Sequence, residues 1–73
     1  MAYSKERTSR YLKARMALAG MTIADLARAS GVSADTITNY TRGVAVPRLD
    51  TALALAETLG CTVNDICGYG EVA

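Results

Sequence analysis

Basic side chains are distributed unevenly along this 73-residue sequence, whose overall net charge is only +1. Eight basic and three acidic residues give residues 1–48 a net charge of +5, whereas four acidic and no basic residues give residues 49–73 a net charge of −4. Guanidinium and ammonium groups gathered in one half of a chain can bind phosphate groups, and this polarity is typical of a protein that binds a nucleic-acid groove. A solvated surface with chance clustering of charge fits the same count.

Side chains that could catalyse a reaction or bind a metal are few. The sequence has no histidine, and its two cysteines, Cys61 and Cys67, are not spaced as in a zinc half-site. No nucleophile can be paired with a general base from these residues. We therefore expect no enzymatic activity, no metal and no cofactor, and we interpret the two cysteines as reduced thiols that behave as small apolar side chains.

The element that would position the basic side chains lies in residues 20–43. Ala27 is followed by Gly31 four residues later and by Ile37 six residues after that. A small side chain lets two helix axes cross closely, and glycine lets the chain leave a helix through a left-handed conformation. This spacing predicts a helix-turn-helix, whose second helix can enter a DNA major groove.

Apolar periodicity and capping residues predict an all-α, compact five-helix bundle in a single domain, residues 1–73. The expected helices cover about residues 5–19, 23–29, 34–41, 49–59 and 63–67, followed by a loose C-terminal tail, residues 68–73. Thr22 with Asp25, and Ser33, are the expected caps of the second and third helices.

The same spacing predicts which side chains form the core. The expected buried residues are Leu12, Met16, Ala19, Leu26, Ile37, Tyr40, Leu49, Leu53, Ala56, Leu59, Val63 and Ile66. No apolar run is long enough to span a membrane, and no apolar segment follows the N-terminal charges as it would in a secretory signal. We therefore expect a cytoplasmic protein.

With these residues placed, the sequence resembles the phage-repressor family of helix-turn-helix domains, of the Cro/cI-like or XRE type. The resemblance extends from about Leu12 to Cys67. It is carried by Gly20-Met21-Thr22, Asp25-Leu26-Ala27, Gly31-Val32-Ser33, Thr36-Ile37-Thr38-Asn39-Tyr40, Arg42-Gly43, Pro47, Leu53, Ala56, Leu59-Gly60 and Val63-Asn64-Asp65-Ile66. It implies a lambda-repressor-like fold in a bacterial, phage or plasmid protein.

The resemblance implies that residues 33–41 form the recognition helix and that Ala34, Asp35, Thr38 and Asn39 face the base edges. Asn39 can make a bidentate contact with adenine, and Ala34 can pack against a thymine methyl group. Asp35 can accept a hydrogen bond from cytosine, or it can simply stabilise the positive end of the helix.

Phosphate contacts are expected from residues around this helix: Arg10, Lys13, Thr22, Arg28, Ser33, Thr36, Arg42 and Arg48. Two positions depart from the family pattern. Ile23 stands where the family commonly has Gln, which places an apolar side chain near the DNA unless it turns inward. Arg48 stands where the family often has a capping Ser or Thr.

The function expected from these features is that of a sequence-specific transcriptional regulator, a repressor, which inserts the helix at 33–41 into the major groove of a near-palindromic operator. A homodimer is expected, with its interface on the acidic half and near Tyr69, and no small-molecule ligand is expected. The alternative is a protein-interaction module that kept the scaffold and lost DNA binding. Ile23, Asp35 and the low net charge favour it, and residues 44–46 would add an apolar rim.

Overall fold

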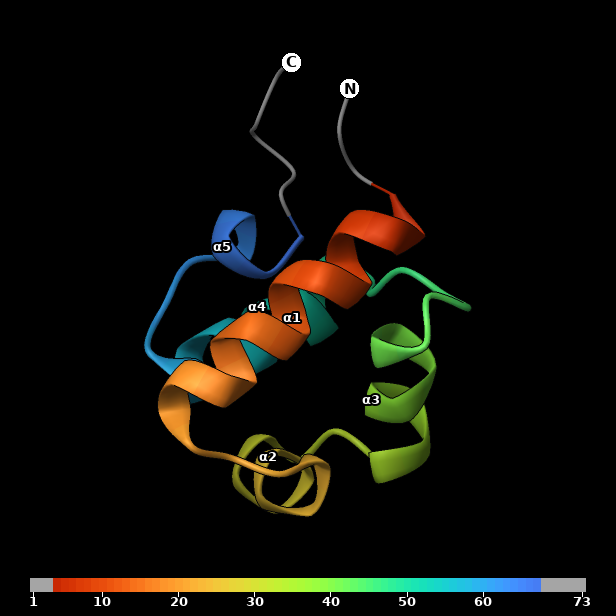
Figure 1. The fold of residues 1–73 in the computed structure, drawn as a ribbon. Helices are drawn as coiled ribbons and strands as arrows, with labels where there is room; N and C mark the ends of the chain where they lie inside the picture. The colour runs from red at the N-terminus through yellow and green to blue at the C-terminus, as the bar shows by residue number, and fades with distance from the viewer. Residues whose placement is uncertain (1–3, 68–73) are drawn as a thin grey trace.

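Five α-helices build the part of the protein that the structure, a computed structural model, describes, residues 4–67 (Figure 1). They are α1 (Lys5–Ala19), α2 (Ile23–Ser30), α3 (Ala34–Thr41), α4 (Leu49–Leu59) and α5 (Val63–Cys67). No strand occurs within residues 4–67, so the predicted all-α, five-helix fold is confirmed. Helix α2 ends one residue beyond its expected end, and the predicted tail at residues 68–73 lies outside the described residues.

The start of α2 is held by the capping box that the sequence predicts. The Thr22 hydroxyl accepts a hydrogen bond from the Asp25 N–H, and the Asp25 carboxylate accepts one from the Thr22 N–H, each at 3.1 Å. These hydrogen bonds lower the pKa of Asp25 below its ordinary value, the bond from the Thr22 backbone most strongly. At the other end of α2, Gly31 has φ +79°, the left-handed conformation expected there. The caps therefore define the turn that leads into α3.

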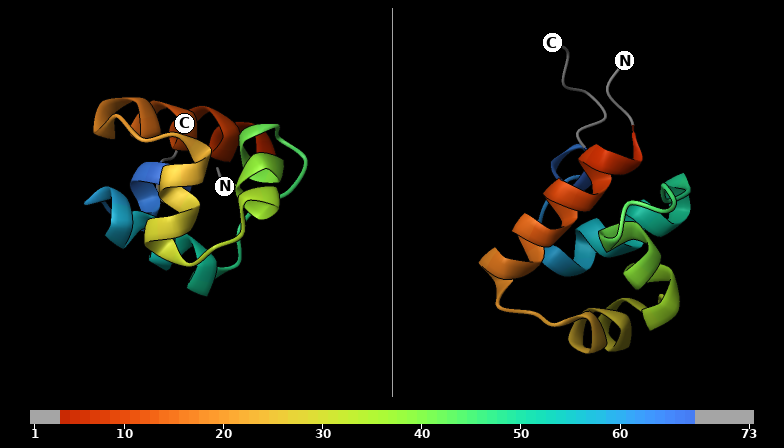
Figure 2. Two further views of the ribbon diagram at one scale, coloured as in Figure 1. Left: turned by 90° about the horizontal axis from the view of Figure 1, so that it is seen from below. Right: turned by 45° about the vertical axis from the view of Figure 1, so that its right-hand side comes forward.

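The core lies where α1 packs against α3, α4 and α5, while α2 packs against α3 and α4. Figure 2 shows α2 and α3 together at the end of the molecule opposite α5. The buried apolar residues are Leu12, Met16, Leu26, Ile37, Tyr40, Ala52, Leu55, Ala56, Ile66 and Cys67. Both helices of the predicted motif thus contribute one face to a shared core and keep the other face outside.

The prediction of burial is wrong for three residues. Leu49 and Leu53 are exposed on α4, and Ala19 is exposed at the end of α1. Helix α4 instead turns Ala52, Leu55 and Ala56 inward, and the small alanines allow its close approach to the other helices. The sequence of α4 is apolar on more than one side, so helical periodicity fits both faces and packing chooses between them.

A buried hydroxyl in α1 is a feature of the core that the sequence did not predict. The Thr8 side chain is fully buried, and its Oγ1 has no hydrogen-bond partner among residues 4–67. A buried hydroxyl without a partner loses its hydration without compensation. The unpaired Thr8 hydroxyl therefore lowers the free energy of unfolding of the protein.

Replacing Thr8 by valine is expected to raise the free energy of unfolding by about 1 kcal/mol, because the shape is kept and the unpaired hydroxyl is removed. Urea denaturation followed by circular dichroism measures the change. Thr58→Val is the matched control, since the Thr58 hydroxyl donates to the Ala54 carbonyl at 2.9 Å. Thr58→Val should not raise the free energy of unfolding. A Thr8→Val protein less stable than the wild type would contradict this account of Thr8.

None of the helices that residues 4–67 form combines the length and the apolar character needed to cross a membrane.

Candidate nucleic-acid interface

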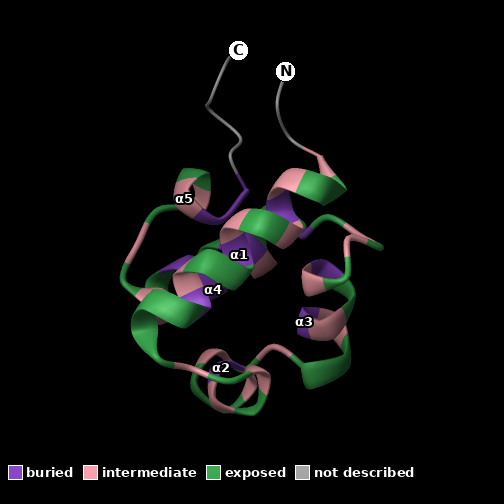
Figure 3. Ribbon diagram, viewed as in Figure 1, coloured by how far each residue is buried: buried purple, intermediate pink, exposed green. Residues whose placement is uncertain are grey.

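Helix α3 divides its side chains between the core and the outside of the molecule. Ile37 and Tyr40 are buried, as predicted, because positions three residues apart share a helix face. Ala34, Asp35 and Asn39 are exposed and Thr38 is half-buried. Figure 3 shows the buried residues of α3 facing the other helices and its exposed residues facing outward. All four residues predicted to face bases therefore lie on accessible parts of one short helix.

Tyr40 belongs to the support of α3 rather than to its outer surface. Its side chain is only 6% exposed, and burial raises the pKa of its hydroxyl above the ordinary value. The hydroxyl therefore stays uncharged at neutral pH. The prediction that Tyr40 is a core residue is confirmed.

The hydroxyl groups at the start of α2 and α3 differ in what they can still offer to a ligand. Ser33 accepts a hydrogen bond from the Thr36 N–H at 3.2 Å and donates its own proton to Thr36 Oγ1 at 2.7 Å. Thr22 accepts from the Asp25 N–H, and neither Thr22 nor Thr36 uses its own hydroxyl proton within residues 4–67. Of the three predicted phosphate-binding hydroxyls, Thr22 and Thr36 are therefore free to donate outward, whereas Ser33 is engaged as a cap.

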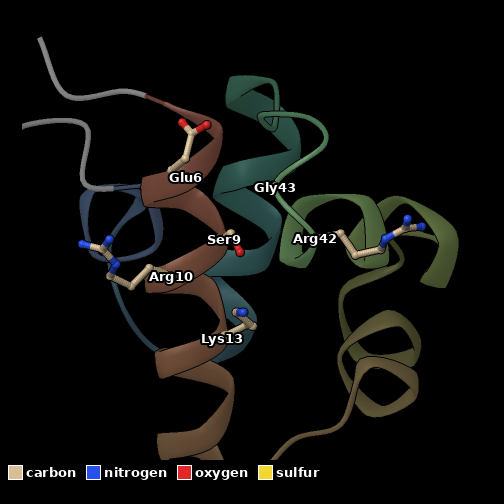
Figure 4. A pocket seen from close by; sticks show the side chains of 6 residues that line it. All are labelled: Glu6, Ser9, Arg10, Lys13, Arg42 and Gly43. Carbon is tan, nitrogen blue, oxygen red and sulfur yellow. The ribbon is translucent and has the colours of Figure 1, made fainter.

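An open groove of about 470 Å³ runs between α1 and the end of α3 (Figure 4). Its lining residues are Glu6, Ser9, Arg10, Lys13, Arg42 and Gly43. The Ser9 hydroxyl donates a hydrogen bond of 2.6 Å to the Thr41 carbonyl, which ties α1 to the last turn of α3. This bond fixes where Arg42, the residue at the C-terminal end of α3, lies relative to α1.

The three cations of this groove do not converge on one point. Figure 4 shows Arg10 and Arg42 extending away from each other, with Lys13 between them on the side of α1 nearer α3. Within the described part of the chain, none of the three forms an ion pair. Lys13 and Arg42 therefore form the positively charged surface beside α3, and Arg10 extends it along α1.

The other two arginines predicted to bind phosphate are already paired. Arg28 lies 2.9 Å from Asp25 and Arg48 lies 3.3 Å from Asp50, and both arginine side chains are largely exposed. Such surface pairs contribute little stability, so a phosphate can replace the carboxylate at small cost. Their carboxylates nevertheless reduce the local positive charge beside Arg28 and Arg48, whereas Lys13 and Arg42 form no ion pair within residues 4–67.

Arg48 precedes α4 without capping it. No side-chain cap is formed by Arg48, as expected for a residue with no acceptor. Asp50 supplies the acceptor instead, because its Oδ1 receives a hydrogen bond of 2.8 Å from the Thr51 N–H. An aspartate in the first helical turn is the sequence signal that could have identified this arrangement.

Ile23, which stands where the family commonly has Gln, turns partly inward. It is half-buried and packs against the core. It also lines a second, smaller groove of about 300 Å³ together with Lys13, Met16, Ala17, Met21 and Thr41. Ala45 is likewise half-buried, so the apolar rim proposed for a protein partner is smaller than the sequence suggested and consists of Val44 and Val46.

Cys61 and Cys67 form no disulfide within residues 4–67. Cys67 is buried in the core and Cys61 is half-buried, where burial raises the pKa of its thiol. Within the described residues, no group of three or more His, Cys, Asp or Glu side chains is placed to hold a metal ion.

Ser9 is the positioning residue that sequence reasoning missed. It lies 32 residues from Thr41 along the chain, and nothing in the local pattern of α1 distinguishes it from an ordinary exposed serine. Glu6, at the edge of the same groove, also escaped notice. Only the packing of α1 against α3 brings these residues to the candidate interface.

Comparison with known protein families matches residues 12–66 to a family described as helix-turn-helix. This range covers most of the chain and contains all of α2, α3 and α4. No curated protein and no solved structure matched the chain.

Proposed function

Because this chain belongs to the helix-turn-helix family of the XRE, Cro and cI type and is therefore a DNA-binding domain, we propose that it is a sequence-specific regulator of transcription. Helix α3 enters the major groove and reads base edges there. One observation carries this proposal: the outer face of α3 is accessible along its length, and cations without an ion pair in residues 4–67 flank its C-terminal end. A polar helix face beside positive charge is what a groove reader requires.

Base reading falls to Ala34, Asp35, Thr38 and Asn39. Asn39 has the amide group that pairs with the N6 and N7 atoms of adenine, and it is exposed. Ala34 offers a methyl group to thymine in the first turn of the helix. Asp35 lies in the same turn, where it also stabilises the positive helix end.

We assign phosphate binding to basic side chains and hydroxyl groups around α3. Lys13 and Arg42 contribute most, and Thr22 and Thr36 donate hydroxyl hydrogen bonds. Arg10, Arg28, Ser33 and Arg48 complete the set, with the arginine–carboxylate pairs opening on contact with DNA. Because these contacts neutralise phosphates and release counterions, the affinity should fall with salt with a log–log slope of about −0.9 per contact.

A protein bound at a site that overlaps a promoter blocks access to that promoter, so repression at such a site would need no surface beyond the DNA-binding one. A single α3 reads only a few base pairs, so selectivity calls for two copies on a near-palindromic site. Their recognition helices would be spaced by about one duplex turn, ~34 Å. The chain therefore acts as a homodimeric repressor with double-stranded DNA as its partner.

Replacing Asn39 by alanine is expected to relax the preference at one base pair per half-site, at a cost of about 1–3 kcal/mol on the preferred site. The wild-type site is first enriched from a pool of random duplexes, and the affinities of both proteins for every substitution of that site are then measured by fluorescence anisotropy. An unchanged preference at all positions would remove the proposed role of Asn39.

The same titrations distinguish the regulator from the protein-interaction module. Wild-type protein at tens of micromolar that leaves labelled random duplex unbound at low salt would favour the interaction module. Salt-sensitive binding without any enriched sequence would indicate a DNA-binding protein that does not select a site.

A further inference from the structure

A small apolar groove lies beside the positively charged surface. It measures about 300 Å³ and is formed where α1, the start of α2 and the end of α3 meet. Its lining residues are Lys13, Met16, Ala17, Met21, Ile23 and Thr41. We refer to it as the methionine groove, because both methionines of residues 4–67 line it.

The walls of the methionine groove are apolar. Met16 is only 7% exposed, and Met21 and Ile23 are half-buried and pack against the core. Thr41 uses its hydroxyl proton within α3, since its Oγ1 donates a hydrogen bond of 2.9 Å to the Thr38 carbonyl. Thioether side chains are flexible and adapt to apolar ligands of different shapes. The walls therefore suit an aliphatic or aromatic group.

Lys13 supplies the only charge among the six lining residues. Its side chain is exposed and forms no ion pair within the described residues. Lys13 also lines the larger groove that contains Arg42, and Figure 4 shows it on the side of α1 nearer α3. Because one ammonium group serves both grooves, a ligand anion that pairs with Lys13 competes with a DNA phosphate for it.

We propose that the methionine groove binds a small carboxylate with an apolar body, whose anionic end pairs with Lys13, and that this ligand weakens DNA binding. Small-molecule sites are mostly apolar with a few placed polar groups, and about 300 Å³ is at the lower end of their volumes. The effect on DNA rests on the proposed function, because it requires Lys13 to bind phosphate. The sequence alone predicts no such ligand, since Lys13, Ile23 and Thr41 meet only in the folded chain.

Sodium octanoate is the probe, because it has one carboxylate and an unbranched apolar chain. Titration into the isotope-labelled full chain without DNA, followed by heteronuclear NMR, should shift the amide signals of Met16, Ala17 and Met21. The expected Kd is about 0.1–1 mM, because an open groove covers only part of a small ligand. Octanol lacks the charge and acetate lacks the chain, so each should bind at least about tenfold more weakly. Lys13→Ala should reduce the affinity for octanoate to that for octanol.

A substitution that fills the groove tests its location. Ala17→Phe places a ring in the groove, and because Ala17 is exposed the ring requires no change in the core. This variant should bind octanoate at least about tenfold more weakly and keep the DNA affinity of the wild type. Ala14→Phe is the matched control, since Ala14 is an exposed residue of the same helix that lines a different groove. Its affinity for octanoate should equal that of the wild type, and circular dichroism confirms that both variants are folded.

Competition is measured by fluorescence anisotropy of labelled random duplex at constant ionic strength, with acetate in place of octanoate as the reference. Saturating octanoate should weaken DNA binding by the wild type at least about threefold, the order of one lost phosphate contact. Lys13→Ala should show this loss without octanoate and no further loss with it. The DNA affinity of Ala17→Phe should not respond to octanoate.

Each part of the proposal can be contradicted separately. Octanoate that shifts no signal of the groove residues up to about 10 mM, or that binds Ala14→Phe as poorly as Ala17→Phe, would overturn the ligand site. An Ala17→Phe protein with weak DNA binding in the absence of octanoate would also overturn it, because the groove would then hold part of the DNA. Undiminished DNA affinity with octanoate bound would overturn the competition. A protein that binds octanoate but no DNA would contradict the proposed regulator and support the ligand site alone.

Discussion

Ile37→Ala is expected to lower the free energy of unfolding by about 2–5 kcal/mol, the cost of removing a buried aliphatic side chain and leaving a cavity. Ile37 is fully buried on the inner face of α3 and belongs to the main core cluster. A domain of this size has a total stability of roughly 4–11 kcal/mol, so the variant should lose a large part of it. The reason is structural, since the recognition helix has eight residues and is held in place by packing rather than by its own propensity.

Chemical denaturation followed by circular dichroism measures this loss, and DNA affinity should fall in proportion to the unfolded fraction. Leu18→Ala provides the control, because it removes a comparable side chain from an exposed position of α1 and should change stability by no more than about 0.5 kcal/mol. Equal destabilisation by the two substitutions would mean that Ile37 does not anchor α3 as described.

The second large expected effect is a loss of DNA affinity when two basic side chains are removed. Replacing both Lys13 and Arg42 by alanine should weaken DNA binding on every sequence, because the two side chains line the groove beside α3 and form no ion pair within the described residues. The salt dependence should become shallower by about 0.9 for each phosphate that is no longer neutralised, so by about 1.8 for the pair. Anisotropy titrations on random and selected duplexes at several salt concentrations give both quantities.

Arg15→Ala separates a local effect from a change in overall charge. Arg15 faces Asp65 of α5 at 3.6 Å, away from α3, and its removal lowers the net charge without touching the groove. Its salt slope should equal that of the wild type. A slope that shifts as much in Arg15→Ala as in the single variants Lys13→Ala and Arg42→Ala would assign the effect to net charge and not to this surface.

The local features of this protein follow from its sequence. The capping box of Thr22 with Asp25, the Ser33 cap and the left-handed Gly31 each depend on residues within a few positions of one another, so their geometry is set by neighbours along the chain. The helix-turn-helix and the inward direction of Ile37 and Tyr40 follow from the same short-range spacing. Fold class, family and the outward face of α3 could therefore be predicted.

Tertiary structure decided which face of α4 is buried, which side chains meet α1 and which basic residues form ion pairs, because these features depend on how the helices pack. The choice between the two apolar faces of α4, which leaves Leu49 and Leu53 exposed, is made by packing against the other helices. The Ser9–Thr41 hydrogen bond and the burial of Thr8 arise only when α1 meets other helices. Whether an arginine or lysine has a carboxylate beside it within residues 4–67 depends on where each side chain lies in the folded molecule. Sequence spacing specifies which side of a helix a residue occupies, but only the packing between helices determines what that side meets.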